Sequence, residues 1–206
     1  MAIISSILPV RGIVYIEFDD GRRLCVRKKD VSALSLASGS EYDYEALKSV
    51  LCRAQLGDAY ESALSSLDVC ARTEKQIRDK LKAKGYLNDT ISAVCERLKQ
   101  ARLIDDKDYA ARVVQASALS GRGKYAVKRK LISKGISACD AEDALETLTD
   151  EAQAESAYNE ARRLLRKYES LLPRDLKNKL SQALARRGYS WDSIEAALGR
   201  LISDQD

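Results

Sequence analysis

The C-terminal three quarters of the chain repeats one pattern three times, and this repeat limits the possible folds more than any other feature. The repeats align on Gly85, Gly135 and Gly188, which are 50 and then 53 residues apart. Apolar residues recur at fixed helical offsets on both sides of each glycine. They are Ile77, Leu81, Val127, Leu131, Leu180 and Leu184 before it, and Ile91, Cys95, Leu98, Ala141, Leu145, Leu148, Ile194, Leu198 and Leu201 after it. Each repeat is therefore predicted to contain a helix, a basic helix that ends at the glycine, and a third helix.

Residues that start and stop helices occur where this interpretation needs them. Thr73 followed by Gln76 predicts a capping box at the start of the second helix of the first repeat. Ser137 and Ser190 stand at N-cap positions just after their glycines. Pro173 suits the first position of the second helix in the third repeat. The three glycines themselves fit the left-handed conformation that commonly follows a helix.

The N-terminal part of the chain lacks the repeat and contains a predicted β-hairpin. Apolar residues alternate over 13–18 and again over 22–27, so each segment is expected to bury one face. Asp20 and Gly21 lie between them and suit a two-residue type I′ turn. Two short helices are predicted to follow, one over about 29–37 and one over about 44–56 that ends at Gly57.

These patterns predict an all-α fold of tandem three-helix repeats that form an elongated, curved solenoid, after a small N-terminal module with a β-hairpin. The predicted boundaries are 1–56 for the N-terminal module and 57–104, 105–150 and 151–206 for the three repeats. A module of about 50 residues buries only a small core, so it gains stability from its neighbours.

The composition argues against an enzyme. The chain has no histidine, which removes the commonest general base at neutral pH and the commonest metal ligand. No phosphate-binding glycine motif or nucleophile motif is present. The five cysteines form no CxxC pair, which is typical of reduced thiols in a cytosolic protein. We therefore predict no catalytic residue, cofactor or metal, no membrane segment, and, because no heptad seam is found, a monomer.

Basic residues recur in and beside the second helix of each repeat, and they are the candidate binding residues. The chain has 35 Lys and Arg against 31 Asp and Glu, a net charge of +4. The candidates are Arg72, Lys75, Arg78, Lys82, Arg122, Lys124, Lys128, Arg129, Lys130, Lys134, Arg162, Arg163, Arg166, Lys177, Arg186 and Arg187. We expect Lys124, Lys128, Arg129 and Lys130 to be their centre, because no acidic residue lies between positions 121 and 139.

Such a band can bind phosphates or an acidic protein surface, and it can also be an ordinary solvated face. Tyrosines near it, such as Tyr86 and Tyr189, can stack on bases. We expect these two to cover the core instead, since Ile136 holds the same place in the second repeat.

Four segments resemble the RecX family. Residues 72–86 are similar to R-[ST]-x-x-E-[LI]-x-x-K-L-x-x-K-G-[YF], and residues 103–110 to L-[IL]-[DN]-D-x-x-[FY]-A. Residues 130–136 resemble the E-L-x-x-K-G-[IV] segment, and residues 186–190 the R-R-G-[FY]-[ST] ending. The chain departs from the family pattern at Gln76 and Lys130, where Glu is usual, and at Arg102, where Gly is common.

The resemblance implies a function as well as a fold. RecX-like proteins are cytoplasmic, lie in the helical groove of the RecA–DNA filament, and inhibit its growth, strand exchange and coprotease work. The resemblance therefore implies that the RecA recombinase filament is the partner, with single- or double-stranded DNA phosphates within reach. The residues alone leave open an alternative, a helical repeat protein that binds nucleic acid independently.

Overall fold

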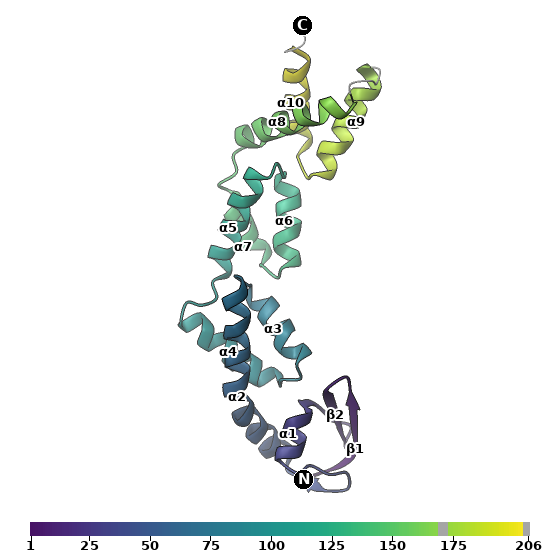
Figure 1. Ribbon diagram of the computed structural model, residues 1–206, viewed down its shortest axis with the longest axis vertical. Coiled ribbons are helices and arrows are strands. Elements are labelled where there is room, and N and C mark those ends of the chain that lie inside the picture. The colour runs from purple at the N-terminus through teal and green to yellow at the C-terminus, as the bar shows by residue number, and fades with distance from the viewer. Residues whose placement is uncertain (169–172, 204–206) are drawn as a thin grey trace. The chain divides into compact units, whose positions relative to one another are not determined.

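The computed structural model describes residues 1–168 and 173–203, which form ten helices and a four-stranded sheet (Figure 1). The strands are β1 (Ala2–Val10), β2 (Ile13–Phe18), β3 (Arg23–Arg27) and β4 (Glu41–Tyr42). The helices are α1 (Lys28–Ala33), α2 (Tyr44–Val69), α3 (Glu74–Ala83), α4 (Asn88–Gln100), α5 (Asp106–Leu119), α6 (Lys124–Ser133), α7 (Ala138–Leu145), α8 (Asp150–Tyr168), α9 (Pro173–Arg186) and α10 (Trp191–Ser203). The chain divides into two compact units, Met1–Asp105 and Asp106–Asp206.

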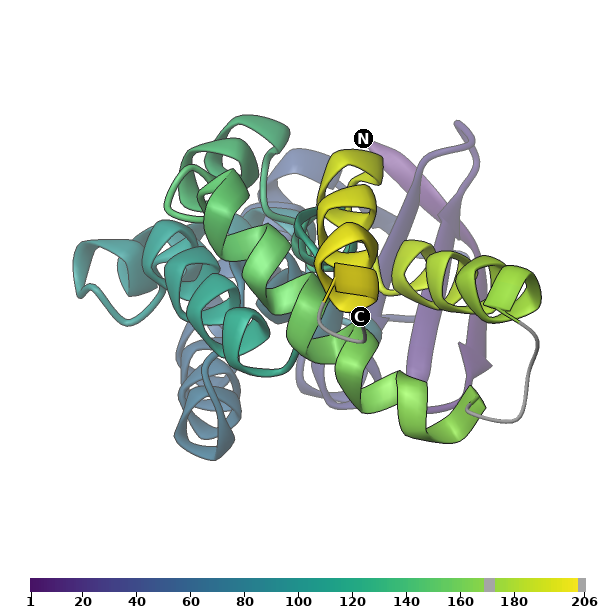
Figure 2. The ribbon, with the colours of Figure 1, turned by 90° about the horizontal axis from the view of Figure 1, so that it is seen from above.

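The three-helix repeats predicted from the sequence are confirmed. The second half of α2 packs with α3 and α4 in unit 1, and unit 2 contains α5–α7 and α8–α10, where α10 lies across α8 (Figure 2). All fifteen recurring apolar positions are buried. The repeat glycines have φ of 83°, 95° and 87°, as a left-handed helix end requires. The capping box of Thr73 and Gln76 and the caps at Ser137 and Ser190 are present.

The N-terminal sheet is larger than the predicted hairpin. Its strand order is β3-β2-β1-β4, with every neighbouring pair antiparallel. The β2–β3 hairpin and its buried face are confirmed, but β1 and β4 were not predicted. A bulge between Ile4 and Ser6 breaks the alternation of β1, and β4 has only two residues. Neither strand therefore shows in the sequence the alternation of apolar and polar residues by which a strand is recognised.

The turn between β2 and β3 differs from the prediction. The N–H of Phe18 donates to the carbonyl of Arg22, so three residues rather than two connect the strands. Only Gly21 has a positive φ, of 82°, whereas a type I′ turn would also need one at Asp20. A two-residue turn with two positive φ values occurs instead between β1 and β2, at Arg11 (51°) and Gly12 (88°).

The predicted end of a helix at Gly57 is wrong, because α2 runs without a break from Tyr44 to Val69. Its buried positions recur every four residues through the glycine and are Leu47, Leu51, Gln55, Ala59 and Ala63. Burial of this continuous stripe outweighs the cost of about 1 kcal/mol for glycine inside a helix. The first half packs on the sheet and the second half on α3 and α4, so the predicted boundary after residue 56 falls inside one helix. The helix predicted over 29–37 is α1, which ends earlier, at Ala33.

A buried polar network joins the sheet to the first repeat. Gln55 is fully buried, and its amide nitrogen donates to Asp30 (2.6 Å) while its oxygen accepts from the N–H of Leu87 (2.9 Å). Asp30 also accepts from the guanidinium of Arg27 (2.9 Å), which donates in turn to Asp58 (2.9 Å). Since each buried group has a partner, the network fixes the end of β3 against α2 and α4.

In unit 2, the start of α6 packs against the end of α9, and backbone hydrogen bonds join the two helices (Figure 1). The N-cap residue of α6 is Gly123, which has no side chain to cap the helix. Instead, Gly123 donates to the carbonyl of Arg187 (3.1 Å), Tyr125 to that of Gly188 (3.0 Å), and Lys124 to the side chain of Gln153 (2.8 Å). The third repeat therefore satisfies backbone donors that every helix start leaves open.

A side chain at this junction would not fit. A Cβ on Gly123 would lie 2.2 Å from the carbonyl carbon of Gly188, and a Cβ on Gly188 would lie 2.3 Å from the nitrogen of Ala126. We expect Gly123→Ala to destabilise unit 2 by about 3 kcal/mol, because overpacking against backbone forces the helices apart. Thermal unfolding followed by circular dichroism measures this loss. Gly199→Ala in α10, where a Cβ meets nothing within 4 Å, is the matched control and should be neutral or stabilising. Equal unfolding midpoints for the two variants would contradict the assigned packing.

The buried network gives a second prediction. Gln55→Leu preserves the size of the side chain but removes the acceptor of the Leu87 N–H and of the Thr90 hydroxyl, and it removes one donor to Asp30, which keeps Arg27. Chemical denaturation should show a loss of about 2–5 kcal/mol, because unsatisfied buried polar groups are costly. The same change at the exposed Gln100 should alter stability by less than about 0.5 kcal/mol. A Gln55→Leu variant as stable as the parent would refute the importance of the network.

Candidate partner-binding surface

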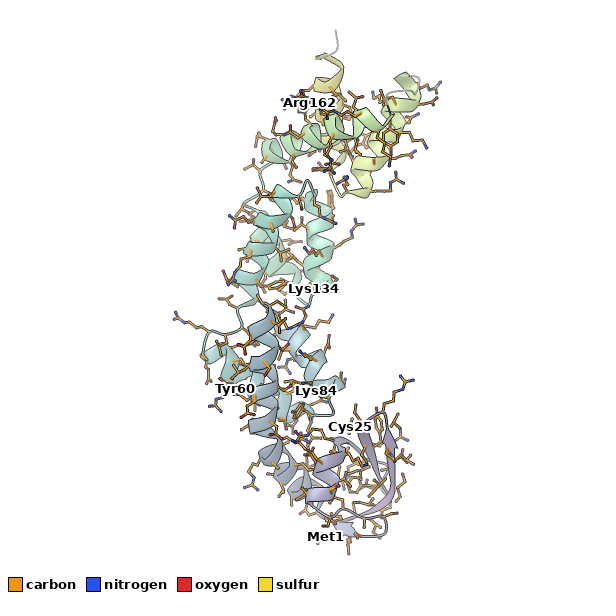
Figure 3. The ribbon with its side chains drawn as sticks, viewed as in Figure 1. Met1, Cys25, Tyr60, Lys84, Lys134 and Arg162 are labelled. Atoms are coloured by element: carbon orange, nitrogen blue, oxygen red, sulfur yellow. The ribbon has the colours of Figure 1, made fainter. Side chains whose placement is uncertain are left out.

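The basic residues of α6 lie on different faces of the helix. Val127 and Leu131 are fully buried and define the inward face. At 100° per residue, Lys124 and Lys128 lie on one flank of that face, and Lys130 and Lys134 (labelled in Figure 3) on the other. The outward face carries Arg129 together with two exposed apolar side chains, Tyr125 (59% exposed) and Ile132 (45%). The predicted centre of the band is thus divided among three faces.

The acid-free stretch of sequence is not acid-free in space. Carboxylates from α7, α8 and α10 surround a recess of about 650 Å³ beside α6, and they are Glu142, Glu146, Asp150, Glu151 and Asp192. Lys124 and Lys128 line the same recess, and Lys128 pairs with Glu142 (2.5 Å). The hydrogen bond from Lys128 lowers the pKa of Glu142 below its ordinary value. This flank of α6 therefore presents mixed charge.

In α3 the corresponding flank is also paired. Arg78 donates to Glu74 (2.7 Å), and Lys99 of α4 pairs with the same carboxylate (2.6 Å). Burial alone would raise the pKa of Glu74, but the hydrogen bonds from Lys99 and Arg78 outweigh it and hold that pKa below its ordinary value. The exposed face of α3 carries Lys75 and Lys82.

Other cations in α3 and at its two ends hold the helix against α2. Lys80 donates to the hydroxyl of Ser66 (2.9 Å), and Arg72 donates to the carbonyl of that residue (3.1 Å). Lys84, labelled in Figure 3, donates to the hydroxyl of Ser62 (2.6 Å). These contacts give Arg72 a structural role within unit 1.

In the third repeat, two of the candidates share one buried carboxylate. Glu160, which is 5% exposed, accepts from Arg163 (3.1 Å) and pairs with Arg187 (2.8 Å). Because a buried carboxylate needs such partners, these arginines stabilise the fold. Arg162, labelled on α8 in Figure 3, is exposed. Within residues 1–168 and 173–203, the predicted cations that form no ion pair and are exposed are Lys75, Lys82, Arg122, Arg129, Lys130, Arg162, Arg166, Lys177 and Arg186.

The aromatic residues divide in the same way. Tyr86 (7% exposed) and Tyr189 (4%) cover the core as predicted, and the hydroxyl of Tyr189 lies 2.8 Å from that of Ser156. Tyr125 and Trp191 are exposed, the latter by 62%. Sequence reasoning missed Trp191, although a tryptophan directly after the N-cap of α10 lies outside the apolar stripe and could have been noticed. Each exposed ring offers a flat apolar surface on which a partner molecule can pack.

The described residues hold no group of three or more side chains suited to bind a metal ion. Within the same part of the chain, no helix combines the length and apolar character needed to cross a membrane. Burial raises the pKa of the Cys95 thiol, which fits the predicted core position of this residue.

Comparison with known proteins identifies the repeats. Family models described as the first, second and third three-helix domains of RecX match residues 59–98, 105–145 and 150–198. The chain is 32% identical to the regulatory protein RecX of Streptococcus pneumoniae serotype 19F (strain G54), over 98% of this chain and 78% of the relative. It is 30% identical to the regulatory protein RecX of Streptococcus gordonii (strain Challis), with the same coverage.

Solved structures agree with the sequence comparisons. A crystal structure of regulatory protein RecX has a TM-score of 0.66 and 30% identity, and covers 95% of this chain and 98% of its own. The crystal structure of RecX from Lactobacillus salivarius has a TM-score of 0.68 and 33% identity, with coverage of 72% and 97%. Family models, full-length relatives and solved structures thus agree with the three-helix repeats described above, and the chain belongs to the RecX family.

Proposed function

We propose that this chain binds the RecA–DNA filament and inhibits its ATP turnover, strand exchange and coprotease activity during DNA repair and recombination. Its relatives are named regulatory proteins, which supports a regulatory role. The observation that carries the proposal is the set of exposed cations without ion pairs, which recurs in all three repeats. The proposal includes a cytoplasmic monomer without catalytic residues or cofactor, and the curved solenoid predicted from the repeats.

A repeating partner suits this arrangement. Exposed cations in successive repeats offer several weak contacts rather than one deep site, and a filament offers the complementary groups several times. The charge is also moderate, because many cations are already paired within the fold. A net charge of +4 suits a partner surface made of both RecA and DNA better than non-specific electrostatic binding to DNA alone.

One observation favours the alternative, an independent nucleic-acid-binding repeat protein. Tyr125 and Trp191 are exposed in unit 2, and aromatic rings beside basic side chains are a common platform for unpaired bases. In that case, naked DNA rather than the RecA filament would be the preferred target.

Preformed RecA–single-stranded DNA filaments distinguish the two functions. ATP turnover and strand exchange are followed as this protein is added at sub-stoichiometric amounts. Inhibition under these conditions is the expected result. Unchanged RecA activity, together with tight binding to naked DNA, would establish the alternative.

Two exposed cations of α6, Arg129 and Lys130, give a specific prediction. Arg129→Glu combined with Lys130→Glu should weaken inhibition by about 10-fold, a loss of roughly 1.4 kcal/mol, because both side chains are exposed and form no ion pair. The concentration of protein that halves RecA ATP turnover measures this effect. We chose Lys130 over Lys128 because Lys128 already pairs with Glu142.

Two control variants accompany the double reversal. Lys128→Glu with Glu142→Lys exchanges an existing ion pair at constant net charge and should retain inhibition within about 2-fold. Leu131→Ala should lower the thermal midpoint by opening a cavity, at a cost of about 2–5 kcal/mol. If the double reversal folds normally and inhibits RecA like the parent, Arg129 and Lys130 are only solvated surface.

A further inference from the structure

A basic recess of about 400 Å³ lies in unit 1, where two segments of the N-terminal module meet the end of α3. They are the turn between β1 and β2, the start of α1, and the end of α3. The basic residues that line the recess are Arg11, Arg27, Lys28, Lys29 and Lys84. No carboxylate from residues 1–168 or 173–203 is among the lining groups. Arg11, Lys28 and Lys29 were not among the basic residues singled out from the sequence.

The walls of the recess are held by the close packing at Gly85. A Cβ at this position would lie 3.3 Å from the backbone carbon of Val26, so the left-handed glycine brings the end of α3 against the end of β3. Tyr86 follows it into the core, and the guanidinium of Arg27 stacks over its ring at 4.5 Å. The position of Lys84 relative to the sheet is therefore set by buried contacts.

Only part of the charge around the recess is compensated. Arg27 and Lys29 both pair with Asp58, and the hydrogen bonds from Lys29 and then Arg27 lower the pKa of that carboxyl. Lys84 donates to the neutral hydroxyl of Ser62. Arg11 and Lys28 are exposed, and their side chains form no hydrogen bond or ion pair with any other described residue. Three cations consequently line the recess without a carboxylate of their own.

The backbone at Arg11 is unusual for an arginine. Its φ of 51° lies in the left-handed region, which glycine and asparagine adopt at far lower cost. The two-residue turn places it at the tip, next to Gly12, whose Cβ would meet nothing within 4 Å. The turn geometry itself requires this positive φ, and it places the Arg11 side chain at the edge of the recess.

We propose that this recess binds phosphate groups of a nucleic-acid backbone. Guanidinium and ammonium groups are the usual partners of phosphate oxygens, and Arg11 can donate two parallel hydrogen bonds. Cations from three separate segments match a polyanion with repeated charges better than a single acidic side chain. The contact gives unit 1 a role on DNA and thereby deepens the proposed function, but the recess itself is formed within unit 1.

Fluorescence anisotropy with a labelled single-stranded thymidine oligonucleotide tests the proposal on the full chain across a salt series. Lys28→Gln and Arg11→Gly should each weaken binding by about 5-fold and lower the slope of log affinity against log salt by about 0.7 per lost phosphate contact. Arg11→Gly also relieves the left-handed strain, so its thermal midpoint should rise. Weaker binding by this variant therefore cannot result from unfolding.

Arg53→Gln is the matched control, since Arg53 is exposed on α2, forms no ion pair and does not line the recess. It removes the same charge and should bind DNA within about 2-fold of the parent. Binding by Lys28→Gln and Arg11→Gly equal to that of Arg53→Gln overturns the proposal. If Lys28→Gln and Arg11→Gly bind DNA like the control but lose inhibition of RecA, the recess binds an acidic protein surface instead. Normal DNA binding through the recess without any inhibition of RecA would refute the proposed function and leave the recess as a DNA site.

Discussion

Close backbone packing at Gly85 and Gly188, the glycines that end α3 and α9, underlies much of the rest of this structure. Gly85 approaches the end of β3 in unit 1, and Gly188 approaches the start of α6 in unit 2. Each glycine both ends its helix in a left-handed conformation and leaves space for a neighbouring backbone. Two of the three glycines that make the repeat visible in the sequence are thus also sites of close packing within a unit.

These junctions explain why similar basic residues have different roles. Cations near a junction or near α2 are used inside the fold, as Arg187 is by Glu160 and Lys80 by Ser66. Cations on outward faces, such as Arg129, are exposed and can bind another molecule. The angular position of a residue around its helix, rather than its membership of a basic stretch, decides between the two roles.

Much of the fold was predictable because its signals are local. The apolar period, the capping box at Thr73 and the positive φ of Gly135 each depend on residues within a few turns. The features that were missed depend on distant partners. Gln55 is understood only beside Asp30 and Leu87, and the pairing of Lys128 depends on Glu142, a residue of another helix.

The same limit applied to the two surfaces described here. The recess near Arg11 joins segments more than fifty residues apart, so no single stretch of sequence reveals it. The family resemblance was clear because each repeat motif is a contiguous stretch of sequence. The continuity of α2 through Gly57 was missed because glycine is a local signal for a helix end, whereas the buried stripe that continues the helix extends over a longer segment.

The capping of α6 by later residues has a consequence for synthesis of the chain. A ribosome releases residues in order, so α6 emerges before Gln153, Arg187 and Gly188, which accept its first three backbone donors. Until the third repeat follows, those donors remain with water and the first turn of α6 lacks its final partners. The core of the middle repeat lies within α5–α7, but the first turn of α6 gains its final hydrogen bonds only after the third repeat has been made.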